Sequence, residues 1–409
     1  MALLQFGTNS SARLELADGA VPDEYGMPRG EPLPDPGASL TAALENPIDY
    51  PTLAASTTPS DKIVLVVDRY VPQLAQITGA MVDCLVAAGI DPDGITVLLS
   101  PTRFNADQDD PCHAIAASVR DRIAVVTHEP SDRRQLAYLA ASDAGEPILV
   151  NRTLHEADVV LPVGCLRDDR TAGYFGVHDA IFPTFSDTKT LQRFRPLGSL
   201  AADQAVKRGL VKEVEHVAWL LGINFTVQVV PAGGDQVLHI LAGKSDSVAR
   251  RGRSLYADAW AMTPARRAAL VVAAITGDAR QQTWENLGRA VEAAASLLEE
   301  GGAIAVCCEL SDRPGPGVQR MACTESRSQA LRQIGKERPV DAIPAAQIAR
   351  ALDRNPLYLL SRLDPATVED IGMVPLADAH ELTRLTHRFP SCAVLANAPY
   401  ASVRMEADV

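Results

Sequence analysis

The stretch of this sequence best equipped for chemistry is a charged loop over residues 167–195. A histidine beside carboxylates can be held in one tautomer and can work as an acid or a base near neutral pH. Neighbouring arginines can bind a carboxylate through paired hydrogen bonds. The pattern predicts either acid–base chemistry on an anionic molecule or a solvated loop whose charges pair with one another. The side chains concerned are Arg167, Asp168, Asp169, Arg170, His178, Asp179, Asp187, Lys189, Arg193 and Arg195.

Apolar residues inside this loop favour a packed loop of set shape over a surface connector. Two glycines, Gly173 and Gly176, allow tight turns. Large apolar side chains accompany them, and we expect these to anchor the loop in a core. They are Tyr174, Phe175, Ile181 and Phe182.

Buried strands must position these residues. Continuous apolar runs alternate with helical stretches, which implies a parallel, doubly wound sheet. Ligands of such sheets gather at the carboxyl ends of the strands. The side chains expected there are Asp68, Arg69, Thr102, Arg103 and those of residues 167–170. The predicted strands span residues 62–68, 94–100, 122–129, 146–154 and 157–164, and helices are predicted over 112–122 and 205–222.

A second α/β unit is predicted towards the C-terminus. The strand, helix and strand pattern begins again after the stretch 244–264, which we take as a boundary, and the last strand falls at 392–399. The predicted organisation is an extended Pro/Gly-rich segment over 1–60, an N-terminal α/β domain over 61–262 and a C-terminal α/β domain over 263–409. We expect a cleft between the two domains.

The composition of the chain limits the classes of partner that it can be expected to bind. The chain has 38 basic and 51 acidic residues, a net charge of −13, and only 5% aromatics. Such a surface repels phosphate backbones and lacks base-stacking platforms, so we expect no nucleic-acid partner. No run of about 18 apolar residues or signal-like start occurs, so we expect a cytoplasmic protein without a membrane partner. An anionic small molecule is the expected partner, and oligomeric state is left open.

Several common catalytic signatures are absent. Neither GxGxxG, GxxxxGK[ST] nor GxSxG occurs, which argues against standard dinucleotide, P-loop and serine-hydrolase sites. Seven scattered cysteines form no CxxC pair, and the histidines form no HExxH array. We therefore predict no metal ligand from local spacing. Cys112 beside His113 is the one thiol–imidazole neighbour pair. Adjacent residues of a helix point about 100° apart, so we do not expect these two side chains to act together.

The segment "EADVVLPVGCLRDDRTAGYFGVHDAIFP" (156–183) resembles the signature segment of the nickel-dependent lactate racemase family. In that family an "ADLVIGTG" strand leads to a proline-histidine pair and then to "AGFSGGRKAILPG". Further likenesses follow in the same order over most of residues 60–315. "IVLVVDRYVP" stands where the family has "SDHTRP", "VLLSPTR" where it has "ATGTH", and residues 275–312 where it has a Gly-Gly turn, a helix bearing a lysine, and "GGxIIxxxECxxG".

The resemblance implies a two-domain α/β fold, racemase or epimerase activity on a 2-hydroxy acid, and a lysine-tethered nickel-pincer nucleotide. Carried over by position, the tethering lysine falls on Asp179 and the nickel-binding histidine near Arg195. The two acid–base histidines fall on Arg103 and Asp169, and the helix lysine falls near Arg289. The family's SDHTRP arginine falls on Val71, whereas the aspartate of that motif is kept as Asp68 and the threonine of "ATGTH" as Thr102.

The replacement of the family's lysine and histidines affects whether its nickel cofactor could be bound. A carboxylate cannot form the lysine's tether, and a guanidinium has no lone pair for nickel. Three hypotheses follow: a divergent isomerase with an altered cofactor, a cofactor-free protein that binds or transforms an anionic metabolite, and a non-catalytic scaffold. The catalytic candidates are Asp68, Arg103, Asp169, His178 and Asp179, and the substrate- or cofactor-binding candidates are Arg69, Thr102, Arg170, Arg195, Asn286 and Arg289.

Overall fold

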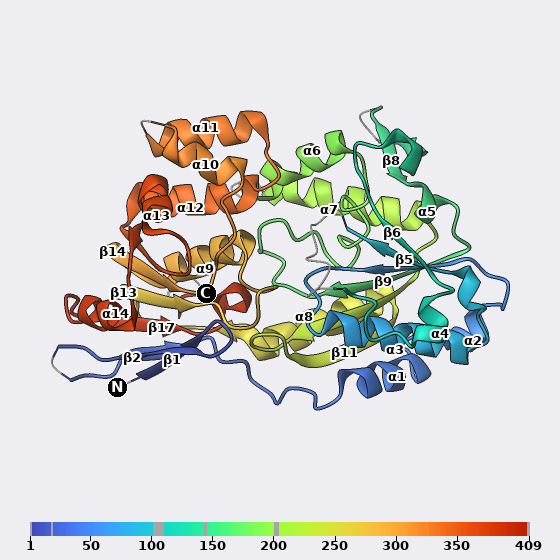
Figure 1. The fold of residues 1–409 in the computed structure, drawn as a ribbon, viewed down its shortest axis with the longest axis horizontal. Helices are drawn as coiled ribbons and strands as arrows, with labels where there is room; N and C mark the ends of the chain where they lie inside the picture. Colours follow the sequence, from blue (N-terminus) through green and yellow to red (C-terminus); the bar gives the residue numbers. More distant parts are fainter. Residues whose placement is uncertain are drawn as a thin grey trace.

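Two α/β units lie side by side in the computed structural model of the chain (Figure 1). The structure describes residues 2–406 except 18, 101–109, 143–144, 200–203 and 325. Each unit is built on a six-stranded, mainly parallel sheet, and helices cover the sheets. The predicted fold class of two mainly parallel α/β sheets is confirmed.

The N-terminal sheet has the strand order β11-β10-β9-β4-β5-β6. All its pairs are parallel except the β10–β11 hairpin, whose connection contains Gly233, Gly234 and Asp235. Every residue of the central strand β4 is buried, because helices and loops cover both faces. The strands are β4 (Ile63–Val67), β5 (Ile95–Leu99), β6 (Ala124–Thr127), β9 (Val159–Cys165), β10 (Phe225–Pro231) and β11 (Val237–Lys244).

The C-terminal sheet has the order β16-β15-β14-β13-β17-β3, and all its pairs are parallel. Its edge strand β3 comes from the start of the chain and pairs with β17, the last strand of this sheet in sequence. The strands are β13 (Ala268–Ala274), β14 (Leu298–Cys307), β15 (Leu357–Leu360), β16 (Val374–Pro375), β17 (Cys392–Leu395) and β3 (Asp23–Tyr25).

Helix α9 (Trp284–Leu297) carries C-terminal residues towards the N-terminal unit. Its first turn is capped by Thr283, whose hydroxyl accepts a hydrogen bond from the Asn286 amide at 3.2 Å. Other long helices are α3 (Leu74–Ala87), α6 (Thr188–Ser199), α7 (Gln204–Leu220), α8 (Ser245–Trp260), α11 (Arg327–Glu337) and α12 (Ala342–Arg354). Shorter ones are α2 (Leu53–Ser56), α4 (Ala117–Arg120), α5 (Arg152–His155), α10 (Pro316–Ala322), α13 (Pro365–Ile371) and α14 (Ala379–Thr386).

The expectation of an extended segment over residues 1–60 needs correction. The segment contains the antiparallel hairpin β1 (Ala2–Phe6) and β2 (Ser10–Leu14), then β3, and then helix α1 (Pro36–Glu45). Proline is well suited to the first turn of a helix, and the Asp35 side chain caps α1 by accepting from the Ala38 amide. The proline and aspartate that suggested irregular chain therefore mark the start of a helix.

Three other local predictions differ from the structure. The strand expected at 146–154 is β8 (Pro147–Asn151), which pairs with β7 (Leu136–Ala141) outside the two main sheets. The helix expected at 112–122 shrinks to the four residues of α4. The boundary stretch 244–264 is mostly helix α8, whose buried side chains, Trp260 among them, pack it onto the N-terminal unit.

Candidate functional site

The candidate site lies where loops of the N-terminal unit meet helix α9. Residues 68–70 follow the carboxyl end of β4, and Arg167 follows that of β9. β4 and β9 are neighbours in the sheet, so both loops emerge at one edge. From the other unit, α9 contributes Glu285 and Arg289.

Three arginines surround the ring of Tyr70. The guanidinium carbons of Arg69, Arg167 and Arg289 lie 4.5, 4.8 and 4.7 Å from the ring centroid. Arg167 also approaches the ring of Tyr400, at 5.8 Å. Aromatic faces attract cations, so the rings help to hold charges that would otherwise repel each other. We call Arg69, Arg167, Arg289 and Tyr70 the arginine cluster.

The three arginines differ in their partners. Arg69 forms an ion pair with Glu285 across the two units, at 3.1 Å, and lowers the pKa of that carboxyl against the opposing effect of burial. Arg289 donates to the neutral Oδ1 of Asn286 at 3.0 Å. Arg167 is 5% exposed, and its Nη1 is buried without a hydrogen-bond partner among the described residues. Burial, followed by repulsion from Arg167, lowers the pKa of Arg289.

Two carboxyls lie beside the cluster. Burial raises the pKa of Asp68, although the Tyr70 amide donates to its Oδ1 at 3.1 Å and the arginines oppose the shift. Burial and then the nearby charge of Asp68 raise the pKa of Asp179 well above its ordinary value. The Phe175 amide donates to Asp179 Oδ2 at 3.4 Å. Because these carboxyls keep their protons to a higher pH than free ones, they neutralise the arginines less than their number suggests.

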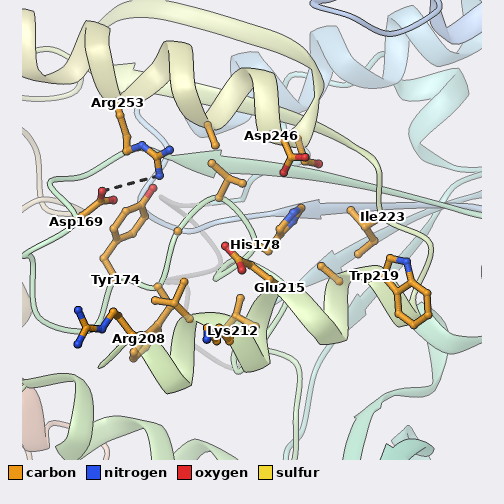
Figure 2. A pocket seen from close by; sticks show the side chains of 18 of the residues that line it. Asp169, Tyr174, His178, Arg208, Lys212, Glu215, Trp219, Ile223, Asp246 and Arg253 are labelled. Carbon is orange, nitrogen blue, oxygen red and sulfur yellow. Dashed lines mark ion pairs between the residues drawn. The ribbon is translucent and has the colours of Figure 1, made fainter. Parts of the chain in front are cut away.

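His178 faces away from this cluster although it precedes Asp179 in sequence. It lines a cavity of about 640 Å³ between α7 and α8, where its ring lies between the two helices (Figure 2). Burial lowers the pKa of His178 to about 4, against the opposing effect of Asp246. Its Nδ1 has no hydrogen-bond partner among the described residues. The expected His178–Asp179 acid–base pair is therefore split between two sites.

Asp169 and Arg170 also lie away from the cluster. Asp169 is exposed and pairs with Arg253 at 4.0 Å (Figure 2), while Arg170 holds Asp168 by two hydrogen bonds of 3.1 and 3.0 Å. Arg170 reaches the other unit as well, at Ser402 Oγ, 3.0 Å away. Burial by itself would raise the pKa of Asp168. Hydrogen bonds from Arg170 and Ser402 outweigh burial and lower that pKa to about 2.

The remaining candidates have mixed outcomes. Asn286 is 2% exposed and is fixed by Gln281, whose carbonyl accepts from its Nδ2 at 2.8 Å, so it positions Arg289. Arg195 on α6 is half-buried. Burial, together with the positive charge of Arg69, lowers the pKa of Arg195 against the opposing effect of Asp341. Thr102 and Arg103 lie outside the described residues.

The structure thus brings together five of the candidates, namely Asp68, Arg69, Asp179, Asn286 and Arg289. It adds Tyr70 and Glu285, which the sequence had not singled out. It also adds Arg167, which was expected at a strand end but was not among the catalytic or binding candidates. Arg167 and Tyr70 had a usable signal, because each comes within three residues of the end of a buried parallel strand. Glu285 had none, because its place depends on how α9 docks against the other unit.

A cavity of about 170 Å³ lies between the two units beside the cluster, where Arg170, Arg289 and Ser402 contribute to its lining. It is the part of the expected cleft that the described residues outline. Within those residues, no helix is both long and apolar enough to cross a membrane.

Residues 7–205 match the lactate racemase N-terminal domain. This chain carries a lactate racemase N-terminal domain. The predicted resemblance to that family is confirmed. The whole chain is also similar to the lactate racemase apoprotein of Thermoanaerobacterium thermosaccharolyticum, with a TM-score of 0.81 and 17% identity over 98% of this chain and 100% of the other.

A protein of Thermotoga maritima is similar as well, with a TM-score of 0.67 and 13% identity over 92% of this chain and 99% of the other. At these identities the two structures establish the fold. The curated proteins contain no match to the sequence.

The described residues do not fit the family's tethered nickel cofactor. At the tether position, Asp179 offers a buried carboxyl that faces Asp68 and has no amine to form the bond. Near the position of the nickel-binding histidine, Arg195 has no lone pair to donate to a metal. No group of three histidine, cysteine or carboxylate side chains within the described part of the chain could hold a metal ion. The lactate racemase fold is therefore kept with a different set of charged groups.

Proposed function

We propose that this lactate-racemase-like protein binds a small carboxylate metabolite of the 2-hydroxy-acid class at the arginine cluster. The observation that carries the proposal is Arg167, a buried arginine whose Nη1 has no partner among the described residues. Buried charges are costly unless they are paired, so a protein that retains one has a use for it. A bound carboxylate would accept from this donor.

The charge balance of the cluster supports an anionic ligand. Of the three carboxyls near the arginines, Glu285 is held ionised by Arg69, whereas the pKa values of Asp68 and Asp179 are raised. Among the described residues, Arg167 and Arg289 also form no ion pair, and Arg289 donates instead to the uncharged amide of Asn286. Guanidinium groups bind carboxylates through two parallel hydrogen bonds, which orients the ligand as well as attracting it.

We further propose isomerase chemistry by proton transfer, because Asp68 and Asp179 form a pair of interacting carboxyls. In such a pair one group can be ionised while the other keeps its proton. The ionised carboxyl would take the proton from C2 of the bound acid, and the protonated one would donate its proton to the other face. One C–H bond breaks and one forms, no electron leaves the substrate, and the arginines stabilise the added negative charge at the carboxylate.

Binding and chemistry are tested in two steps. Isothermal titration calorimetry with a panel of 2-hydroxy acids, beginning with both lactate enantiomers, measures binding. Proton NMR of a binding acid in D₂O then measures loss of the C2 hydrogen signal. We expect exchange with the wild-type protein, little with Asp68→Asn or Asp179→Asn, and normal exchange with the exposed control Asp370→Asn.

The two steps separate the two proposals. If no member of the panel binds, the metabolite proposal fails. If an acid binds but its C2 hydrogen never exchanges, the protein binds without isomerising, and the proton-transfer proposal fails alone.

A further inference from the structure

The cavity between α7 and α8 is a second place where a ligand would fit. Its apolar wall consists of Phe175, Val214, Ala218 and Ile223, each at most 5% exposed. At its rim the indole of Trp219 is 70% exposed and stacks on His216, with ring centroids 5.8 Å apart. A volume of about 640 Å³ is that of a typical small-molecule site.

Two buried polar atoms in this cavity lack partners. Ser245, the first residue of α8, is 6% exposed, and its Oγ has no hydrogen-bond partner among the described residues. The Nδ1 of His178 is the other such atom. Buried polar groups in native proteins are nearly always hydrogen-bonded. Two such atoms without a partner in one cavity therefore indicate that a polar group of a ligand, or water, binds there. Both atoms belong to residues that line the same cavity.

The charges around the cavity favour an anion. Its cationic side chains are Lys207, Arg208, Lys212, Lys244 and Arg253, and its carboxylates are Asp169, Glu215 and Asp246. Lys207 donates to the Asp169 and Thr171 carbonyls, and Arg253 pairs with Asp169. Among the described residues, Arg208, Lys212 and Lys244 form no ion pair, so unpaired cations outnumber the unpaired carboxylates Glu215 and Asp246. In a chain of net charge −13, this is a local reversal of sign.

We propose that the cavity between α7 and α8 binds a small organic anion with a flat apolar body. The body lies against the apolar wall and Trp219, and the polar groups meet His178 and Ser245. This site is distinct from the arginine cluster, because His178 and Asp179 face opposite sides of one loop. The proposal does not depend on the proposed function, since none of the cavity's lining residues belongs to the cluster.

The probe for this site is 8-anilinonaphthalene-1-sulfonate, an aromatic anion whose fluorescence rises in apolar surroundings. We expect one saturable site per chain on the native protein. Ala249→Phe, which fills the cavity from α8, is expected to weaken binding about ten-fold or more. Ala257→Phe is the matched control, because Ala257 is exposed on the same helix outside the cavity.

Two further variants test the details and do not disturb the core. Trp219→Ala is expected to weaken binding about five-fold, whereas Tyr138→Ala, at an exposed aromatic elsewhere, has no effect. Lys212→Glu is expected to weaken binding about three-fold and Lys336→Glu, with the same change of net charge, much less. The uncharged N-phenyl-1-naphthylamine should bind more weakly than the sulfonate.

Three results would overturn the proposal. The first is binding of the sulfonate to folded Ala249→Phe as tightly as to wild type. The second is equal affinity of Trp219→Ala and Tyr138→Ala, which also decides the matter if Ala249→Phe does not fold. The third is equal affinity for the charged and uncharged probes, which would remove the case for an anion.

Discussion

The arginine cluster and the cavity between α7 and α8 lie on two sides of one loop, and they differ in how much charge they hold. The cluster packs charge densely, with three guanidiniums around one ring. The cavity leaves room and places a neutral imidazole inside it. Burial raises the pKa of Asp179 and lowers that of its neighbour His178, so in both cases it favours the uncharged form. Two residues that are adjacent in sequence can thus belong to two different sites when the loop that carries them is packed on both sides.

The largest expected effect concerns His178. Its pKa falls from an ordinary 6.5 to about 4 on folding, so the unfolded chain binds the extra proton first as pH drops. The stability that the neutral ring contributes is complete above pH 6.5 and is lost as pH falls through about 4. We expect wild type to lose about 3 kcal/mol of unfolding free energy relative to His178→Gln over this range. Urea unfolding of both proteins at several pH values measures the difference. A difference that does not change with pH would place His178 in a wetter environment than the cavity wall.

The second prediction concerns Arg167. Arg167→Met keeps an unbranched side chain of similar length and removes a buried charge that has an unpaired Nη1. We expect stability equal to or above that of wild type, together with an affinity for the bound hydroxy acid about 100-fold lower. Thermal unfolding and calorimetry measure the two quantities, with exposed Arg388→Met as the control. A large loss of stability with unchanged affinity would make Arg167 a structural residue.

The smallest effect concerns the ion pair that joins the two units. Arg69→Met leaves Glu285 half-buried without its partner, which should cost about 1–2 kcal/mol of unfolding free energy. Arg122→Met removes more exposed ion pairs with Asp91 and Asp93 and should cost much less unfolding free energy, because water screens those charges. Urea unfolding of the two variants gives the comparison. Equal losses would mean that the interface between the units is as wet as the open surface.

The strand ends were the most predictable part of the site. Continuous apolar runs revealed β4 and β9, and the rule that ligands gather at the carboxyl ends of parallel strands led to Asp68, Arg69 and the 167–170 stretch. The choice within that stretch was less successful, because a pattern of charges does not tell which side chain turns inward. Arg167 enters the cluster, whereas Asp169 and Arg170 point elsewhere.

Contacts between distant segments could not be predicted from local patterns. Glu285 reaches Arg69 only because α9 docks against the other unit. The split of His178 from Asp179 depends on the turn between Phe175 and Asp179, which carries no signature of its own beyond Gly176. The resemblance to the lactate racemase family could be recognised although most motif residues differ, because it rests on several segments in the same order over most of residues 60–315 and not on one motif.

The strand pairing at the edge of the C-terminal sheet also bears on how the chain is made. β3 is synthesised long before its partner β17, because the pairing joins Asp23 to Ala393. The early hairpin β1–β2 likewise packs into the core that β13 and β17 complete. During synthesis, the N-terminal sheet can close while β1–β3 still await their neighbours. Contacts this distant in sequence are slow to form, so the C-terminal unit of the newborn protein should become resistant to proteases later than the N-terminal unit.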